Sequence, residues 1–451
     1  MSELLERARQ ILASRQGAEE IEVYLSRGTD TNVRVYEGAI EHLSSATSEG
    51  VGVRVLLDGP LGARVGCAWA GSLEETAVLN ALAQARDNST FASEGEFLAF
   101  ARPDGVTPVS LQLTDPAVAS TATTDKIEMA IELERLVRHG DPRIRQIKAS
   151  NYSDYMAEMA IASTVGIGAT YNRSGAHVSV EAIASDGRSD QTGWGLSVGR
   201  GPGDLNLNEA ALDAITRSTR MLGAVKAASM KTTAVFDPRT AATLISIIGG
   251  ALSGEAVQRG RSFFMNRLGE LVASPLFTLL DDPTDPRHFG ASPIDGEGLA
   301  CRSNLLVDRG RLRAFVYDTV SARRAGTFST GSAIRSGLAS SPAAGCRALQ
   351  LQSSTIDPID LVRGVGTGLY VESLSGVHSG VNPVSGDFSV GVTGRMIRHG
   401  DFAEPVREVT VASTLPRMLF DLVGVASDVQ WLPGNAAGQT IAIDDVAVSG
   451  S

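Results

Sequence analysis

One apolar stretch near the middle of the chain, Ala234–Gly260, constrains the fold more than any other segment. It predicts a short strand and then a helix, because Asp237 can cap a helix and Pro238 suits the first helical position. From Ala241 to Val257, apolar side chains point in nearly every direction around this helix. The pattern therefore predicts a buried central helix, which is too short and too rich in glycine to cross a bilayer.

A single acid, Glu255, lies near the end of the predicted helix, in the segment Gly254-Glu255-Ala256-Val257-Gln258-Arg259. This segment resembles the helix that carries the metal motif His-Glu-x-x-x-His in the TldD/PmbA family of zinc peptidases. The glutamate is present, but Gly254 and Arg259 stand at the two histidine positions. Glycine offers no ligand and a guanidinium repels a cation, whereas a catalytic zinc typically takes three protein ligands. The resemblance thus implies a PmbA (TldE)-type chain with degenerate motif positions and no metal of its own.

A second segment, Asn382–Pro405, resembles the same family through a Gly-Asp-Phe-Ser strand, a turn at Arg398–Asp401 and a following strand. Its glycines would let another backbone approach closely, so the predicted hairpin could accept an extended peptide by strand addition. A strand pair that only holds the domain together is the alternative interpretation. The candidate residues for binding substrate or partner are Asp387, Phe388, Ser389, Gly391, Arg395, His399 and, close by in sequence, His378.

The pattern of the whole chain predicts an α+β fold with two domains. Residues 1–228 are expected to form a sheet with helices, residues 229–451 a β-rich domain wrapped around the central helix. In the first domain, alternating residues bounded by Gly and Asp predict separate strands, at 21–25, 32–38, 51–56, 63–69, 143–150, 157–165, 176–184 and 191–198. Helices are predicted at 2–15, 72–86, 124–138 and 207–222. In the second domain, many short strands are expected, together with helices at 318–324 and 415–423.

A run of acids, Asp281, Asp282, Asp285, Asp295 and Glu297, could bind a hard cation through oxygen ligands. Two Asp-Pro steps and nearby glycines favour a solvated turn region instead. The three cysteines are isolated, so neither a disulfide framework nor a Cys-x-x-Cys metal site is predicted, and Cys301 is expected to be a buried thiol.

Charge and composition limit the class of partner. The formal net charge is −11, which argues against a general nucleic-acid or anionic-membrane partner. The first residues predict an amphipathic helix and not a signal peptide, so a cytoplasmic protein is expected.

The leading hypothesis is a metal-free, non-catalytic TldE-like subunit of a heterodimeric metallopeptidase. A TldD-like partner with His-Glu-x-x-x-His would hold the zinc, and this chain would hold no cofactor. The resemblance implies substrates that are extended peptides or peptide-like precursors of natural products. Two alternatives stay open: a stand-alone peptide-binding or scaffold protein, and a tailoring enzyme of a biosynthetic pathway built on the same fold.

Overall fold

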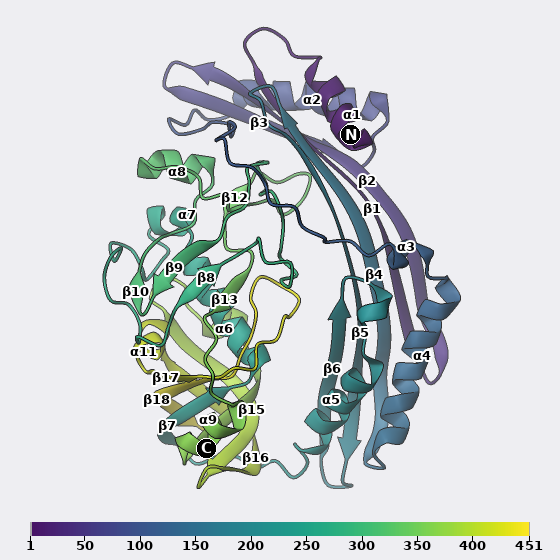
Figure 1. The fold of residues 1–451 in the computed structure, drawn as a ribbon, viewed down its shortest axis with the longest axis vertical. Helices are drawn as coiled ribbons and strands as arrows, with labels where there is room; N and C mark the ends of the chain where they lie inside the picture. The colour runs from purple at the N-terminus through teal and green to yellow at the C-terminus, as the bar shows by residue number, and fades with distance from the viewer. Residues whose placement is uncertain (1, 451) are drawn as a thin grey trace.

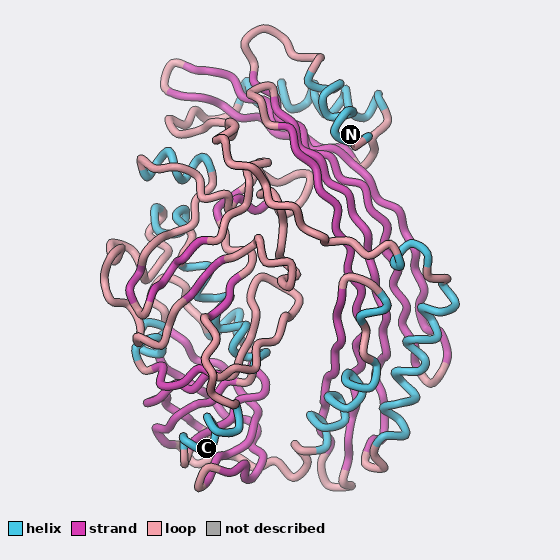
Figure 2. The backbone as a smooth tube through the Cα atoms, in the orientation of Figure 1, coloured by secondary structure: helices cyan, strands magenta, loops and turns pink. Residues whose placement is uncertain are grey.

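Residues 2–450, which the computed structural model describes, form two packed halves of different architecture (Figure 1). The N-terminal half is a long, bent antiparallel sheet with helices, and the C-terminal half contains a smaller barrel (Figure 1). Figure 2 shows strands running through both halves, with helices beside them. This arrangement confirms the predicted α+β fold.

The N-terminal sheet has the strand order β3-β2-β1-β4-β5-β6, and neighbouring strands are antiparallel throughout. Apolar residues on one of its faces pack against helices, whereas the other face turns toward the C-terminal half (Figure 1). The strands are β1 (Glu20–Tyr36), β2 (Ala39–Gly59), β3 (Gly62–Ala70), β4 (Ile144–Ser163), β5 (Gly168–Ser185) and β6 (Asp190–Gly199). The helices are α1 (Glu3–Leu12), α2 (Glu75–Phe91), α3 (Ala117–Ser120), α4 (Thr123–Gly140) and α5 (Leu207–Thr219).

The strands of this sheet are longer than predicted. The sequence predicted a break between residues 25 and 32 and another between 150 and 157, but β1 and β4 continue through both places. β1 pairs with β2 on one side and with β4 on the other across Gly28 and Asp30, so the backbone there stays extended. The prediction of a turn was wrong because pairing on both edges outweighs the local preference of Gly and Asp.

The C-terminal half is built on a second sheet, with the order β16-β15-β14-β7-β18-β17. Pairing between β16 and β18 closes five of these strands into a barrel. Its strands are β7 (Met230–Phe236), β14 (Gly368–Ser375), β15 (Asp387–Arg398), β16 (Asp401–Thr414), β17 (Leu422–Val425) and β18 (Ile441–Ser449). The predicted helix at 415–423 is shorter in the structure, where α11 (Leu415–Phe420) ends at the cap residue Asp421 and β17 begins at Leu422.

Short elements complete this half. One small sheet contains β8 (Leu279–Asp281), β9 (Asn304–Asp308), β10 (Arg311–Leu312) and β13 (Leu349–Leu351), and a second pairs β11 (Ala333–Ile334) with β12 (Ala343–Ala344). The short helices are α8 (Thr319–Ala325), α9 (Pro358–Val365) and α10 (Val377–Gly380), of which α9 and α10 were not predicted. Within residues 2–450, no helix combines the length and apolar character needed to cross a lipid bilayer.

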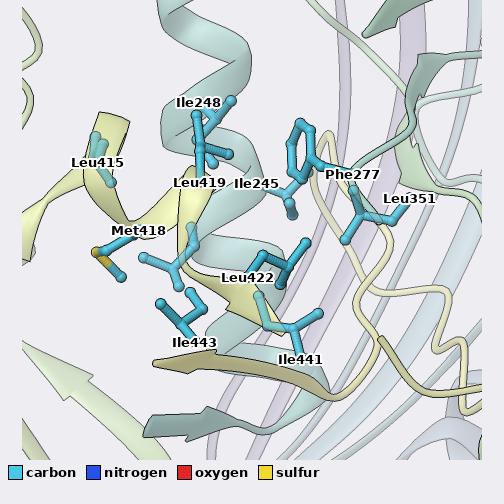
Figure 3. A pocket seen from close by; sticks show the side chains of 11 residues that line it. Ile245, Ile248, Phe277, Leu351, Leu415, Met418, Leu419, Leu422, Ile441 and Ile443 are labelled. Atoms are coloured by element: carbon cyan, nitrogen blue, oxygen red, sulfur yellow. The ribbon is translucent and has the colours of Figure 1, made fainter. Parts of the chain in front are cut away.

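The predicted central helix is α6 (Pro238–Ala251), and it belongs to the largest apolar core. Asp237 caps it as predicted, because a carboxylate oxygen accepts the Thr240 N–H at 2.9 Å. Figure 3 shows Ile245 and Ile248 of α6 beside Phe277, Leu419 and other apolar side chains that line a small pocket. This burial confirms the predicted central helix.

The predicted helix to Val257 is interrupted, which corrects the expectation of one continuous helix. α6 ends at Ala251, and α7 (Gly254–Gln258) begins after a step at Leu252 and Ser253. The Gly254 N–H donates to the Val316 carbonyl at 2.8 Å, and the Val316 N–H donates to the Leu252 carbonyl at 3.0 Å. The helix breaks there because its backbone pairs with a distant segment.

A buried carboxylate joins the two halves. Glu22 of β1 lies 3.0 Å from Arg54 of β2 and 2.5 Å from Arg335, which follows β11. All three side chains are less than one-tenth exposed. Burial by itself would raise the pKa of Glu22, but the charges of Arg54 and Arg335 outweigh it and lower the pKa.

We expect Glu22→Gln to lower the free energy of unfolding by about 3–5 kcal/mol, because it leaves two buried guanidinium groups without a counter-charge. Since the folded-state pKa of Glu22 is lowered, its contribution is present above the ordinary value of 4.5 and is lost as the pH falls through the folded-state pKa. Urea unfolding at several pH values measures both effects. Glu270→Gln, in an exposed pair with Arg267, is the matched control, and equal losses for both variants would contradict the prediction.

Candidate functional site

The motif positions Gly254 and Glu255 lie on α7, just after the step in the central helix, and Arg259 directly follows α7. The carboxylate of Glu255 is 2.6 Å from the guanidinium of Arg259, one helical turn later, and both side chains are partly exposed. The acid on this apolar helix thus has a local cation as its partner.

The other motif position, Gly254, is buried under an aromatic ring. A Cβ atom built on Gly254 would lie 2.1 Å from Cε1 and 2.3 Å from Cδ1 of Tyr317. Tyr317 is held by its backbone, since its N–H donates to the Thr330 hydroxyl at 2.8 Å and its carbonyl accepts the Thr330 N–H at 3.1 Å. Any side chain at position 254, histidine included, therefore requires the tyrosine ring to move.

The candidate binding residues of the hairpin lie in different surroundings. The hairpin itself is confirmed: β15 and β16 meet at His399 and Gly400, which both have positive φ and lie at the centre of the predicted turn at Arg398–Asp401. Asp387, Ser389 and His399 are exposed on the strand or at the turn. Phe388 points into the C-terminal core and is 1% exposed, so it offers no surface to a ligand.

Gly391 and Arg395 are occupied by neighbours within the fold. A Cβ atom on Gly391 would meet the Ser375 hydroxyl at 2.4 Å, so glycine permits a close approach to β14. Arg395 lies 2.8 Å from Glu372 and stacks over Phe402 at 3.7 Å from the ring centroid. Glu372 also pairs with Arg220, after α5, at 2.5 Å. Arg395 thus belongs to a charge network between the two halves.

A cleft runs between the two halves beside β6, the edge strand of the N-terminal sheet. One cavity of about 530 Å³ contains Trp194, Arg217, Glu372 and the exposed His378. Two more cavities continue along the strand as far as Val198. Of the predicted binding residues, this cleft takes in only His378, whereas Asp387, Ser389 and His399 lie outside its lining.

Two arginines form the charged wall of the cleft. Arg217 pairs with Asp213 at 2.7 Å and with Asp237, the cap of α6, at 2.9 Å. Arg239 pairs with Asp213 at 2.5 Å and lies over the Trp194 ring at 5.2 Å from its centroid. Burial alone would lower the pKa of Arg217, but the two aspartates raise it. These residues were not among those predicted from the sequence, although the i, i+4 spacing of Asp213 and Arg217 was an available signal.

Three of the predicted turn acids are buried instead of solvated, which corrects that expectation. Asp281, Asp295 and Glu297 are 0%, 3% and 1% exposed, respectively. Asp295 accepts the N–H groups of Glu297 and Leu299 at 2.9 and 3.0 Å, and Asp281 accepts two more N–H groups from residues 347 and 348. Asp282 and Asp285 accept the nearby N–H groups of Thr284 and Arg287. The run of acids fixes loop backbone in place, and the local turn pattern could not show this burial.

Burial changes the acidity of this region. It raises the pKa of Asp281 to about 6, and it raises the pKa of Glu297 together with the charges of Asp295 and Asp318. Burial also raises the pKa of Cys301 to about 12, in line with the predicted buried thiol. Within residues 2–450, no three His, Cys, Asp or Glu side chains are grouped in a way that could hold a metal ion.

Family models match most of the chain. The PmbA/TldA metallopeptidase C-terminal domain matches residues 229–450, domain 1 matches residues 21–89, and the central domain matches residues 117–222. Relatives include the metalloprotease PmbA of Escherichia coli O157:H7, 25% identical over 91% of this chain and 88% of its own length. The metalloprotease TldD homolog of Haemophilus influenzae is 24% identical over 98% of this chain and 95% of its own.

The fold matches that of a solved relative. TldE from Thermococcus kodakarensis superposes with a TM-score of 0.87 at 20% identity, covering 99% of both chains.

We expect Glu297→Gln to flatten the pH dependence of stability. Because the folded-state pKa is raised above 4.5, the stability linked to Glu297 is fully present below that pH and is lost as the pH rises toward the folded-state pKa. A glutamine can still accept from Thr319, whose N–H and hydroxyl lie 3.0 and 2.7 Å from Glu297. Thermal unfolding between pH 5 and 8, with the exposed Glu128→Gln as control, measures the difference; parallel profiles for Glu297→Gln and the wild type would contradict it.

Proposed function

Because the chain belongs to the PmbA/TldD metallopeptidase family, we propose that it is a metal-free, TldE-like subunit of a heterodimeric zinc peptidase. The single observation that carries this proposal is the Tyr317 ring, packed where a metal-ligating side chain at position 254 would stand. Arg259 at the second ligand position is paired with Glu255, so the acid is engaged as well. A zinc site needs ligands that are free and deprotonated.

The partner in this proposal is a TldD-like chain that carries His-Glu-x-x-x-His. Its zinc would activate a water molecule and polarise the scissile carbonyl. This chain would contribute a binding surface, of which the cleft beside β6 and the exposed residues of β15 are the candidates. The substrate class is extended peptides or peptide-like precursors of natural products, and the expected compartment is the cytoplasm.

Two alternatives make different predictions. A stand-alone peptide-binding or scaffold protein would bind its ligand fully without a second chain. A tailoring enzyme would convert a substrate by itself and would owe its chemistry to other residues of the fold. Purification from the native cell separates these functions from the proposed one.

We expect the isolated chain to bind no stoichiometric zinc and to cleave no peptide, because neither motif position offers a ligand. A second chain of similar size that contains His-Glu-x-x-x-His should co-purify from the native cell, bind zinc and supply the activity. Metal analysis and a peptide-cleavage assay, on the lone chain and on the mixture, are the measurements. Tight zinc together with hydrolysis in the lone chain would overturn the proposal.

We expect Gly254→His to lower the free energy of unfolding by about 1–3 kcal/mol, because the new side chain meets the Tyr317 ring. Adding Tyr317→Ala should recover part of this loss by opening space for the imidazole. Gly250→His is the matched control, since a Cβ atom there has nothing within 4 Å. Urea unfolding is the measurement, and equal stability of the two histidine variants would show that Tyr317 does not exclude a side chain at position 254.

A further inference from the structure

Two arginines meet at the end of the cleft, on the sheet face that is turned toward the C-terminal half. Arg173 lies on β5, and Arg200 directly follows β6. Ala176 pairs with Gly199, so the next step of the same register brings Arg200 opposite Gly175. Gly175 in turn pairs with Tyr155 of β4, which places Arg200, Gly175 and Tyr155 in one row across the sheet.

The ring of Tyr155 fills the space above Gly175. A Cβ atom on Gly175 would lie 2.7 Å from this ring, so the tyrosine can take this position only because residue 175 is a glycine. The guanidinium carbon of Arg173 is 5.7 Å from the centroid of the same ring. Arg200 contacts the C-terminal half. Its guanidinium carbon lies 5.2 Å from the centroid of the Phe289 ring, and its guanidinium donates to the Pro286 carbonyl at 3.3 Å and to the His288 carbonyl. The site thus has walls from both halves of the chain.

Neither guanidinium has a carboxylate partner among residues 2–450. Nε of Arg173 and Nη1 of Arg200 are shielded from solvent and make no hydrogen bond within the described part of the chain. Asp204, the acid beside Arg200, accepts the backbone N–H groups of Arg200 and Gly201. Asp30, opposite Tyr155 on β1, accepts from Asn32. Arg217 and Arg239, by contrast, share aspartates in the same cleft.

Two adjacent, partly buried cations with unused donors are unfavourable unless an anion joins them. Burial lowers the pKa of Arg200, and the charge of Arg173 lowers it further. A carboxylate has two acceptor oxygens in one plane, which suits donors from two guanidinium groups. The chain has a formal net charge of −11, so it repels a carboxylate, with one negative charge, less than it repels a phosphate dianion.

We propose that Arg173 and Arg200, with Tyr155 beside them, bind the C-terminal carboxylate of an extended peptide that lies in the cleft along β6. The peptide part rests on the proposed function, whereas the anion part rests only on these side chains. The cavities follow β6 from Thr192 to Val198, and Arg200 comes two residues after the end of that path. A peptide in the cleft would therefore bring one end of its backbone to the two arginines.

The test uses the full-length chain alone, one unstructured peptide as free acid and as C-terminal amide, and acetate as the small probe. Arg173→Met removes the charge and keeps an apolar stem. Arg145→Met, an exposed arginine on β4, is the matched control for the change in net charge. We expect the wild type and the control to bind the free acid about 10- to 100-fold more tightly than the amide. We expect Arg173→Met to bind the free acid and the amide with the same weak affinity that the wild type has for the amide. Acetate should raise the Tm of the wild type but not that of Arg173→Met.

Stability separates binding from a structural role. Without an anion, Arg173→Met should melt at or above the wild-type Tm, because it removes a partly buried charge that has no carboxylate partner among the described residues. A drop in Tm, with the preference for the free acid retained, would show a structural arginine and overturn the proposal.

The two parts of the proposal fail separately. If acid and amide bind equally well in every variant, the peptide function stands and the anion site is wrong. If acetate stabilises the wild type but neither peptide binds, the anion site stands and its assignment to a peptide terminus is wrong. If neither probe binds, the anion site is wrong.

Discussion

The carboxylate of Glu22, held between Arg54 and Arg335, is the contact on which the relation between the two halves depends. A buried charge tolerates little movement of its partners, because each lost contact leaves an ion without compensation. At the other end of the junction, Glu372 joins Arg220 to Arg395, and Asp237 joins Arg217 to α6. The cleft beside β6 lies between these fixed points, so its walls keep a defined separation.

This architecture uses arginine in two distinct ways. Where an arginine joins the halves, an acid is within a few ångströms, as for Arg217 and Arg395. Arg173 and Arg200 differ because the acids near them are engaged with an amide side chain and with backbone N–H groups. Ion pairs therefore explain Arg217 and Arg395 as contacts that hold the two halves together. Arg173 and Arg200 keep hydrogen-bond donors that no acid of the described residues uses.

The sequence predicted the features that depend on local pattern. The cap at Asp237, the apolar helix after it and the turn at Arg398–Asp401 all follow from neighbouring residues, and the structure confirms them. The local sequence pattern could not predict that the backbone at Gly28 stays extended or that the central helix breaks at Ser253, because both depend on pairing with distant segments. The cleft was missed for the same reason, since its walls come from β6, α6 and β14.

The Tyr317 ring covers Gly254, one of the two positions at which the family resemblance places a histidine. Loss of a ligand by substitution alone would leave an opening that a single reverse substitution could refill. Here the Tyr317 ring occupies the space above residue 254, and the backbone of Tyr317 is bonded to Thr330. A side chain at position 254 therefore needs a shift of the Tyr317 ring, which comes from a segment distant in sequence. Glycine at position 254 is thus part of the packing of the C-terminal half, whereas the cleft beside β6 is lined by side chains from both halves.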